Sequence, residues 1–474
     1  MCHSTAPLDG TAFSRPNLMH IRTPNASACA EACCDWPACG AYTFTSHDPN
    51  SFPKGDNCTH GAPCCFLKTT STDPYKLANC TSGEVVRPPP PAPHGGGSCA
   101  GLPDCSFAGD CVDDRCKCDM PWTGAQCDRL KLQPSKVGAG YPFGDAPSAL
   151  PTNSTFTWGG AVVRDPDSPT SLFHGFFTEY LNHCPMTYGT WSTSTRIRHA
   201  TSETPQGPYT AQDVAVPTAA GNPVLARAPD GTWLLYFTNE RWTRGSRNCT
   251  GPVDSWGPPI YCSASGRQCE TGISLAYSRN LSGPWTLQYN VAQFSCTNPG
   301  APVFSPNGSL VMGYKTWTKH GRCIGVVAAR SWRDWPYNTF PLGSVDSCIA
   351  VEFEVEDPSN LWRDRRGTLH MLVHQDGVGG AAHSVDGGRS WSFNASSPTY
   401  PYTVDYEDGS QLVCSNREEP KVLLDTTGHD PVMLINVCRL ASSQLPNTAP
   451  TKAYPHGEKQ YVTKVVMQPI GEGI

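Results

Sequence analysis

Residues 222–237 read Asn-Pro-Val-Leu-Ala-Arg-Ala-Pro-Asp-Gly-Thr-Trp-Leu-Leu-Tyr-Phe. An apolar stretch precedes the Asp230-Gly231 turn, and a second, strongly apolar stretch follows it. Asp-Gly between two apolar runs is a strong signal for a β-hairpin. The segment therefore predicts two short antiparallel strands, and helix signals stay weak from about residue 133 to the end of the chain.

The same sequence pattern occurs five times. It begins with a small residue or proline and an apolar pair, and continues with a polar turn that contains glycine and an alternating apolar strand. The copies are anchored at Gly160, Pro223, Pro302, Pro358 and Pro420, which lie 63, 79, 56 and 62 residues apart. A repeat of roughly 60 residues suits one four-stranded propeller blade. Because a two-sheet sandwich does not explain five repeats, the sequence predicts a mainly β chain with a five-bladed β-propeller over residues 133–474.

A second sequence motif follows four of the five copies. Residues 202–209 and 278–285 share the pattern Ser-x4-Gly-Pro-aromatic, and residues 331–337 carry a degenerate version. Residues 384–391 fit the Asp-box S-x-D-x-G-x-[ST]-W, which is a hairpin turn on the outside of a blade. We therefore expect these segments to have a structural role.

Composition points to an oxidising compartment. The 474 residues include 24 cysteines, which do not suit a reducing cytosol. No signal peptide is visible, but we expect an extracellular, secreted protein. No run of 18 apolar residues predicts a membrane span, and the net charge of -6 gives no support for nucleic-acid binding. Eight sequons predict glycosylation at Asn25, Asn57, Asn79, Asn153, Asn248, Asn280, Asn307 and Asn394.

Residues 1–82 form a first cysteine-rich module. Cys29 and Cys33 lie four residues apart, as on one face of a short helix, and Tyr42 and Phe44 alternate as on a strand. Residues 15–82 resemble a PAN/apple module, in which a helix is stapled to a small sheet, and such modules bind proteins or carbohydrates. The alternative is a disulfide-held spacer. Nine cysteines cannot all pair internally, so at least one, for which Cys2 is a candidate, is free or pairs elsewhere.

A linker and a second cysteine-rich module follow. Residues 83–98 contain four consecutive prolines and three consecutive glycines, which is typical of a linker. Residues 99–128 resemble an EGF-like domain through the spacing C-x5-C-x5-C-x4-C-x-C-x8-C. Thirty residues bury too little apolar surface to fold without bridges. The resemblance implies the pairs Cys99–Cys111, Cys105–Cys116 and Cys118–Cys127. The residues before Cys99 do not favour the calcium-binding variant.

We call the start of each of the five repeats its head. In a propeller the innermost strands face a central channel, so the five heads are expected to converge at one end of that channel. This architecture resembles the glycoside hydrolases of the arabinanase, xylosidase and invertase group, in which three carboxylates from different blades act as base, acid and orienting residue. The resemblance covers about 330 residues, and it is architectural. The first head, residues 158–162, has no acid where the family has its base. Either the acids have moved between blades or the chain is not a hydrolase.

Carboxylates occur at later heads and at one strand end. We expect the catalytic residues among Glu356, Asp357, Glu179 and Glu418. Neighbouring residues of a regular strand point to opposite faces, so Glu356 and Asp357 cannot both face the channel unless Pro358 breaks the strand. The competing interpretation pairs this acidic dipeptide with the arginines at 363, 365 and 366.

Further polar and aromatic residues predict substrate contacts. Candidates are His199, Trp158, Asn222, His374 and Arg417, the last of which could hold a sugar carboxylate. His370 and His374 share a strand face, but no third ligand is identifiable, so no metal and no cofactor are expected. The sequence thus predicts a secreted glycoside hydrolase acting on a glycan or polysaccharide. The alternative is a non-catalytic glycan-binding or adhesion protein, with protein partners on the cell surface or in the matrix.

Overall fold

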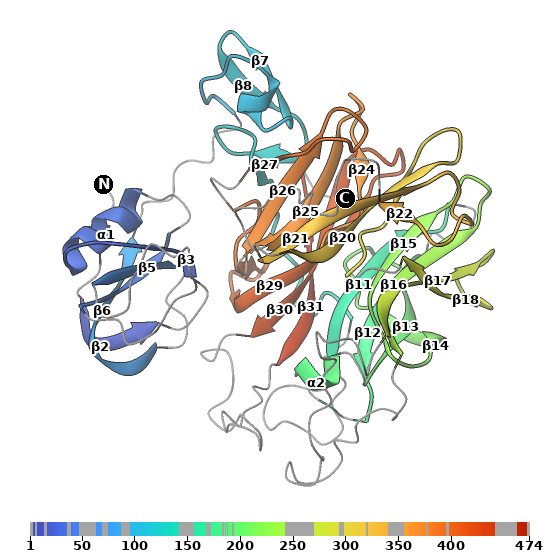
Figure 1. The fold of residues 1–474 in the computed structure, drawn as a ribbon, viewed down its shortest axis with the longest axis horizontal. Coiled ribbons are helices and arrows are strands. Elements are labelled where there is room, and N and C mark those ends of the chain that lie inside the picture. The colour runs from blue at the N-terminus through green and yellow to red at the C-terminus, as the bar shows by residue number, and fades with distance from the viewer. Residues whose placement is uncertain are drawn as a thin grey trace.

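The chain folds into three parts that follow one another along the sequence (Figure 1). They are a small sheet with one helix, a small module around two short strands, and a large assembly of strands. The chain is mainly β. The computed structural model describes residues 3–4, 7–13, 17–35, 39–46, 63–68, 74–86, 95–141, 156–166, 172–182, 184, 186, 188–191, 194–241, 270–292, 298–318, 321–339, 355–375, 378–394, 398–440 and 462–471.

The first part is a six-stranded sheet covered by helix α1 (Ala26–Asp35). The Asn25 side chain caps the helix by accepting the Ala28 N–H at 2.8 Å. A disulfide between Cys29 and Cys65 staples the helix to the sheet. Cys2 lies outside the described residues. The strands are β1 (His3–Ser4), β2 (Leu8–Phe13), β3 (Asn17–Ile21), β4 (Ala41–Thr45), β5 (Cys64–Lys68) and β6 (Pro74–Val86).

The second part is held together by three disulfides. They join Cys99 to Cys111, Cys105 to Cys116 and Cys118 to Cys127, which are the pairs that the EGF-like resemblance implies. Its elements are the 3-10 helix η1 (Leu102–Cys105) and the strands β7 (Gly109–Val112), β8 (Arg115–Cys118), β9 (Trp122–Thr123) and β10 (Arg129–Leu130).

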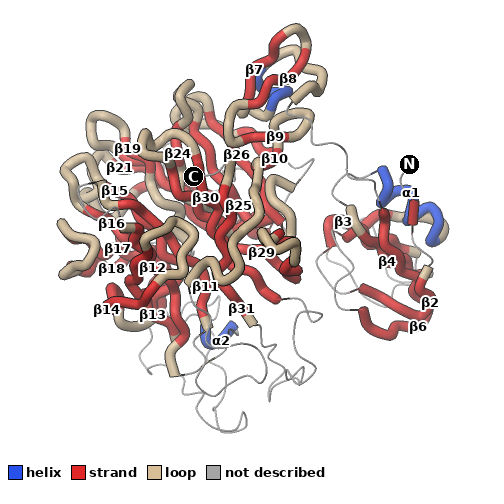
Figure 2. Tube along the Cα trace, turned by 180° about the vertical axis from the view of Figure 1, so that it is seen from behind, coloured by secondary structure: helices blue, strands red, loops and turns tan. Residues whose placement is uncertain are grey.

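The third part is built mainly of strands (Figure 2). Its described strands form five antiparallel sheets that succeed one another along the chain. A short helix, α2 (Tyr188–Trp191), lies between β12 and β13. We number the sheets I to V. Sheet I is β11 (Thr157–Arg164), β12 (Phe173–Tyr180), β13 (Thr195–Ser202) and β14 (Thr210–Val216); sheet II is β15 (Ala220–Arg227), β16 (Trp233–Arg241), β17 (Glu270–Ser278) and β18 (Thr286–Ala292); sheet III is β19 (Val303–Phe304), β20 (Leu310–Thr318), β21 (Gly321–Ala329) and β22 (Asn338–Thr339); sheet IV is β23 (Val355–Glu356), β24 (Trp362–Arg363), β25 (Leu369–Gln375), β26 (Val378–Ser384) and β27 (Ser392–Asn394); sheet V is β28 (Thr403–Asp405), β29 (Gln411–Leu424), β30 (Pro431–Leu440) and β31 (Thr463–Pro469).

Neighbouring sheets pack face to face through apolar side chains. Successive residues of β12 point to opposite faces of sheet I. Phe176 therefore packs with Phe237 of sheet II, whereas Phe177 packs with Tyr141 and with Ile435 of sheet V. Sheet I is thus buried between sheets II and V, the first and last sheets being neighbours.

The start of the third part is tied to its end. The Gln133 N–H donates to the Pro469 carbonyl at 2.9 Å, and the Ser135 hydroxyl donates to the Met467 carbonyl at 2.6 Å. Leu132 also forms a bridge with Ile470. The segment that enters the third part therefore lies along the edge of its last strand, which closes the arrangement of sheets.

The predicted hairpin turn at residues 384–391 is an extensively hydrogen-bonded turn. The Asp386 carboxylate accepts the backbone N–H groups of Arg389 and Ser390, each at 2.9 Å. The Trp391 indole N–H donates to the Gly388 carbonyl at 3.1 Å. The acid and the tryptophan of this motif therefore stabilise the turn itself.

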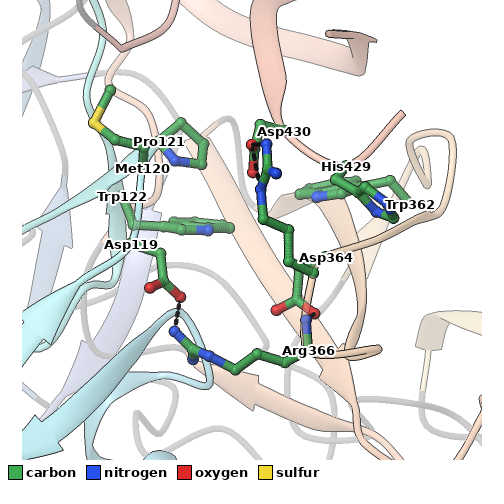
Figure 3. Close-up of a pocket in the computed structure, with 10 residues that line it drawn as sticks. Asp119, Met120, Pro121, Trp122, Trp362, Asp364, Arg366, His429 and Asp430 are labelled. Atoms are coloured by element: carbon green, nitrogen blue, oxygen red, sulfur yellow. Dashed lines mark hydrogen bonds and ion pairs between the residues drawn. The ribbon is translucent and has the colours of Figure 1, made fainter. Parts of the chain in front are cut away.

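The second part is docked onto sheet IV by Trp122, as Figure 3 shows. The Trp122 ring stacks on Trp362 at 6.5 Å and lies 5.8 Å from the rings of both His370 and His383. A salt bridge from Arg366 to an aspartate of the second part flanks the stack. A cavity of about 190 Å³ remains between the two parts. The two parts thus share one buried apolar cluster.

Four of the sequon asparagines, Asn25, Asn79, Asn280 and Asn307, are exposed. The positions 57, 153 and 248 and the side chain of residue 394 lie outside the described residues. Among the described residues, no helix has the length and apolar character needed to cross a membrane. Glycosylation at the eight sequons stays a prediction.

The docking contact predicts a large stability effect at Trp122. This side chain is 3% exposed, so Trp122→Ala removes a buried aromatic ring from the shared cluster. We expect a loss of about 3–5 kcal/mol in the free energy of unfolding, measured by urea titration. The control is Val112→Ala in the same part of the chain, where Val112 is 48% exposed and a change within about 0.5 kcal/mol is expected. Equal effects of the two substitutions would contradict a docked module.

Candidate functional site

One residue from each of the five sheets meets at the centre of the third part. These residues, which we call the central ring, stand at or just before the inner strand of their sheet: Gly159, Asn222, Asn298, Asp357 and Glu419. All five have positive φ, between 52° and 65°. The register of β11, β15 and β29 shifts at these positions, as in a β-bulge, which re-aims a side chain.

Two carboxyl groups of the central ring are linked through asparagine amides. The Asn222 amide donates to Glu419 Oε1 at 2.5 Å. The Asn298 amide donates to Glu419 Oε1 at 3.3 Å and also to Asp357 Oδ1. The Glu419 backbone N–H lies 3.5 Å from Asp357 Oδ2. Sheets II, III, IV and V are therefore connected by hydrogen bonds at one point.

Threonines of the preceding sheets position the two asparagines. The Asn222 N–H donates to the Thr178 hydroxyl at 3.1 Å, and the Asn298 N–H donates to the Thr238 hydroxyl at 2.8 Å. The same device thus repeats between sheets I and II and between sheets II and III. It fixes the backbone from which each amide reaches the carboxyl groups.

The first position of the ring has no side chain, as expected from the sequence. A Cβ atom on Gly159 would lie 3.7 Å from the Cβ and Cγ atoms of Glu419. The ring therefore holds two carboxyl groups, two amides and one glycine. Asp357 is 2% exposed and Glu419 is 1% exposed, so both carboxyl groups are removed from water.

The surroundings of Glu419 favour its protonated form. Burial raises the pKa of Glu419, and the charge of Asp357 raises it further, to about 8. Lys421 works in the other direction, since its ammonium group lies 3.3 Å from Glu419 Oε2. A neutral carboxyl group can donate a proton, as a general acid must.

Asp357 is held ionised beside it. Burial and the charge of Glu356 oppose ionisation, but contact with His374 and the charge of Lys315 lower the pKa of Asp357 below its ordinary value overall. His374 Nδ1 lies 3.4 Å from Asp357 Oδ2. Burial lowers the pKa of His374, yet its contacts with Asp357 and Glu356 raise it to about 10 overall. Two neighbouring carboxyl groups whose pKa values are pushed apart are typical of an acid and base pair.

A rim of charged residues surrounds the ring, and we call it the rim cluster: Lys315, Arg322, Glu356, His374, Glu418 and Arg439. Glu356 accepts from Lys315 at 2.5 Å and also forms a salt bridge with Arg322. Burial opposes its charge, but Lys315 and His374 hold the pKa of Glu356 well below its ordinary value. These cations favour the ionised form of Glu356, which does not suit a general acid at neutral pH, and its partners are Lys315 and Arg322 instead of the predicted arginines 363, 365 and 366.

Glu418 and Trp158 lie together at the rim. Arg439 forms a salt bridge of 2.9 Å with Glu418, and Asn416 donates to the same carboxylate at 2.7 Å. The Arg439 guanidinium lies 6.0 Å from the centre of the Trp158 ring. Trp158 is 4% exposed and packs against Tyr180, so its ring forms part of the core. The structure thus brings Glu418 near the ring but engages it in an ion pair.

The prediction for Glu179 is wrong. Its side chain points to the face of sheet I that packs on sheet V, as Phe177 does, and not to the ring. The Tyr141 hydroxyl donates to Glu179 Oε1 at 2.6 Å, and Arg196 and Arg198 hold Oε2 at 2.7 and 3.2 Å. Glu179 is therefore buried and forms ion pairs with Arg196 and Arg198 within sheet I.

The prediction for His199 is also wrong. Its ring is 1% exposed and stacks on Phe176 within sheet I. One ring nitrogen contacts His174 at 2.9 Å, and the other contacts Asp213 at 2.7 Å. Both nitrogens are engaged inside the sheet, so this histidine cannot reach a ligand at the ring.

Arg417 is misassigned as well. It is fully buried in sheet V, over the ring of Tyr400. Its guanidinium donates to the Asn436 side chain at 3.0 Å and to the carbonyls of Pro401 and Thr403, each at 3.2 Å. Burial lowers the pKa of Arg417 to about 10. These contacts, with one side chain and two backbone carbonyls, hold the guanidinium inside sheet V.

Two ring residues were missed from the sequence, Asn298 and Glu419. Both precede a proline, as Asn222 and Asp357 do. The third repeat was anchored at Pro302, three residues beyond the true equivalent at Pro299, which conceals Asn298. A search for polar residues directly before proline, at intervals between 59 and 76 residues, would have found four of the five ring positions.

Three rim and ring residues could supply metal ligand atoms. The ligand atoms of Glu356, Asp357 and His374 lie within 4.8 Å of one another. Lys315 and Arg322, however, already neutralise Glu356. His370 does not join this group, because it contacts Asp364 at 3.0 Å and His383 at 2.9 Å.

Comparisons with known proteins give one family and a set of similar structures. Residues 102–129 match the teneurin-like EGF domain. No curated protein matches the chain. A family 117 glycoside hydrolase of Zobellia galactanivorans is similar at 12% identity and a TM-score of 0.43, covering 72% of this chain and 90% of that one. A xylan β-1,4-xylosidase of Bacillus halodurans is similar at 15% identity and a TM-score of 0.40, and the match covers 68% of this chain and 54% of that one. A member of the GH130 family of mannoside phosphorylases is similar at 11% identity and a TM-score of 0.45, and the match covers 72% of this chain and 96% of that one.

The raised pKa of Glu419 predicts how stability depends on pH. A carboxyl group with a raised pKa in the folded state stabilises the fold below its unfolded pKa of about 4.3. This contribution is lost as the pH rises through the folded pKa of about 8. We expect wild type to lose stability relative to Glu419→Gln between these two values, measured by urea unfolding at several pH values. A difference in stability that stays constant with pH would contradict a protonated Glu419. In the infrared spectrum, we expect a neutral-carboxyl band in the wild type that titrates with pH and is missing in Glu419→Gln, and a wild-type spectrum without such a band would also contradict it.

Proposed function

We propose that the chain is a carbohydrate-active extracellular protein, a glycoside hydrolase that uses Asp357 and Glu419. The observation that carries this proposal is the buried pair of carboxyl groups whose pKa values are shifted in opposite directions, at the point where all five sheets meet. We further propose that these sheets are the blades of a five-bladed propeller over residues 133–474.

In this proposal Glu419 is the general acid. Cleavage of a glycosidic bond needs one carboxyl group that protonates the leaving oxygen and a second that is ionised. Glu419 supplies the proton, and Asn222 and Asn298 hold its Oε1 in place. Asp357 is the ionised carboxylate: it takes a proton from the water molecule whose oxygen forms the new bond to the sugar as the bond to the leaving oxygen breaks.

Glu356 has a supporting role in this proposal. It is ionised and bound to Lys315, and His374 lies 3.5 Å from it and 3.4 Å from Asp357. A cationic His374 between two carboxylates keeps both of them ionised. Glu356 and His374 therefore position and charge Asp357, the group that takes the proton from water.

A glycan-binding protein without turnover is the second candidate. Three of the five ring positions, Gly159, Asn222 and Asn298, carry no carboxylate. Both ring carboxyl groups are at most 2% exposed, so a substrate must displace side chains to reach them. These two facts favour binding over catalysis.

The other parts of the chain are proposed to act in targeting. We assign residues 1–82 to a PAN/apple-like module, 83–98 to a linker and 99–128 to an EGF-like domain. The two modules would bind cell-surface or matrix proteins, with no nucleic acid and no membrane span involved. The docking of Trp122 on sheet IV means that the EGF-like domain would move with the proposed propeller.

Glu419→Gln separates the two candidates. The amide keeps the size of the side chain but cannot donate a proton to the leaving group. On oligosaccharides of plant and algal origin, we expect turnover to fall by a factor of about 10² to 10⁴ while binding persists. The matched control is Glu407→Gln, at an exposed position, which should leave turnover unchanged.

Two outcomes would overturn the hydrolase. Unchanged turnover in Glu419→Gln would exclude this residue as the acid. Binding of glycans by the wild-type chain, with no turnover of any of them, would establish the second candidate.

A further inference from the structure

The charged side chains that the rim cluster exposes are mostly cationic. The exposed fraction is 27% for the Arg322 side chain, 14% for Lys315 and 13% for Arg439. Among the carboxylates it is 14% for Glu356 and 7% for Glu418. A ligand that approaches the ring therefore meets three partly exposed cations, with Arg322 the most accessible of them.

Lys421, which pairs with Glu419, lies beside the central ring and the rim cluster. The ring and rim themselves hold four basic side chains and four carboxyl groups, so Lys421 brings the basic side chains to one more than the carboxyl groups: Lys315, Arg322, His374, Lys421 and Arg439 against Glu356, Asp357, Glu418 and Glu419. His374 Nδ1 lies 3.5 Å from Glu356 and 3.4 Å from Asp357, and these two carboxylates raise the pKa of His374 to about 10, which favours its cationic form at neutral pH. The excess grows when Glu419 is protonated.

Three buried hydrogen-bond donors lie at the same end of the sheets. Within the described part of the chain, the Trp158 indole N–H, the Tyr180 hydroxyl and the Asn239 amide nitrogen find no hydrogen-bond partner, although the three side chains are only 3–4% exposed. Buried polar groups are almost always paired with protein or with water, so donors without a protein partner are positions where the acceptor oxygens of a ligand can bind.

The strand register places these donors beside the rim. Trp158 directly precedes the ring residue of sheet I, and Tyr180 is the last residue of the neighbouring strand. Asn239 pairs with Ala220, two residues before the ring residue of sheet II. The Arg439 guanidinium lies over the Trp158 ring, so a cation and an unpaired N–H donor are adjacent.

We infer that the glycan which this site accepts carries an anionic substituent, a sugar carboxylate or a sulfate ester, held at the rim by Arg322 and Arg439 and by the Trp158 indole N–H. This inference rests on the proposed function and adds the class of substrate. Carboxylate and sulfate share the chemistry that the rim offers, because both present several acceptor oxygens and a negative charge to guanidinium and N–H donors.

The test is calorimetric binding of matched oligosaccharides by the full chain. One pair is an oligogalacturonide and its fully methyl-esterified form, and the other is a sulfated galactan oligosaccharide and its desulfated form. We expect the wild-type chain to bind the charged member of at least one pair about tenfold more tightly, and the pair that does so identifies carboxylate or sulfate. This preference should weaken as the salt concentration rises.

Three variants locate the contact. Arg322→Gln and Trp158→Phe should each reduce affinity for the charged member several-fold and leave the neutral member unchanged; Trp158→Phe keeps an aromatic ring and removes only the donor. The control, Arg333→Gln, lies beyond the far end of β21, where Arg333 pairs with Asp230 at 3.0 Å, and should change neither affinity. Thermal unfolding checks that each variant is folded.

The outcomes separate this inference from the proposed function. Equal or better binding of the neutral members, with glycan binding intact, would overturn the anionic substituent and leave the proposed function standing. If both Arg322→Gln and Trp158→Phe still bind the charged oligosaccharide more tightly than the neutral one, the rim is not where the anionic substituent binds. Binding of none of the four oligosaccharides and turnover of no glycan would overturn both.

Discussion

The left-handed backbone at the five ring positions is the constraint on which the site depends. A residue other than glycine in this conformation costs about 1–2 kcal/mol. Asn222, Asn298, Asp357 and Glu419 all adopt it, and in each case the next residue is a proline. The hydrogen bonds from Asn222 and Asn298 to the carboxyl groups offset this cost. Strained backbone of this kind persists where the surroundings over-determine it, and it is frequent at functional sites.

The ring in turn requires the five sheets to remain closed around it. The residues before sheet I bond to the last strand of sheet V, through Gln133 and Ser135. Loss of this contact would free sheet V, which carries Glu419, from sheet I, which carries Gly159. The second part of the chain lies immediately before this junction and is fixed to sheet IV by Trp122. The second part thus contacts sheet IV, and the segment that follows it contacts sheet V, which are the two sheets that carry Asp357 and Glu419.

Repetition in the sequence predicted the succession of strands well, but it predicted the site only in part. Periodicity identifies which residues begin an inner strand, so Asp357 and Asn222 were found. The choice between Glu418 and Glu419 depends on a register shift between Glu418 and Lys421, which reverses the face on which a residue appears. The errors at Glu179 and His199 have a related cause. Alternation along a strand predicts that a side chain is buried, but not whether it faces the centre or a neighbouring sheet.

Electrostatics connects the buried ring to the charged rim. In a medium of low polarity two adjacent carboxyl groups cannot both be ionised at neutral pH, so one must keep its proton unless a cation stands beside it. His374 contacts Asp357 and lies at the rim, and it thereby decides which of the two is charged. Lys421 opposes this effect at Glu419, but burial and the charge of Asp357 outweigh it, so the pKa of Glu419 stays above its ordinary value. The cations that surround the ring therefore have two effects. Toward the interior they lower the pKa of Asp357 relative to that of Glu419. Toward the solvent they leave Arg322, Lys315 and Arg439 as the charges that an approaching ligand first meets.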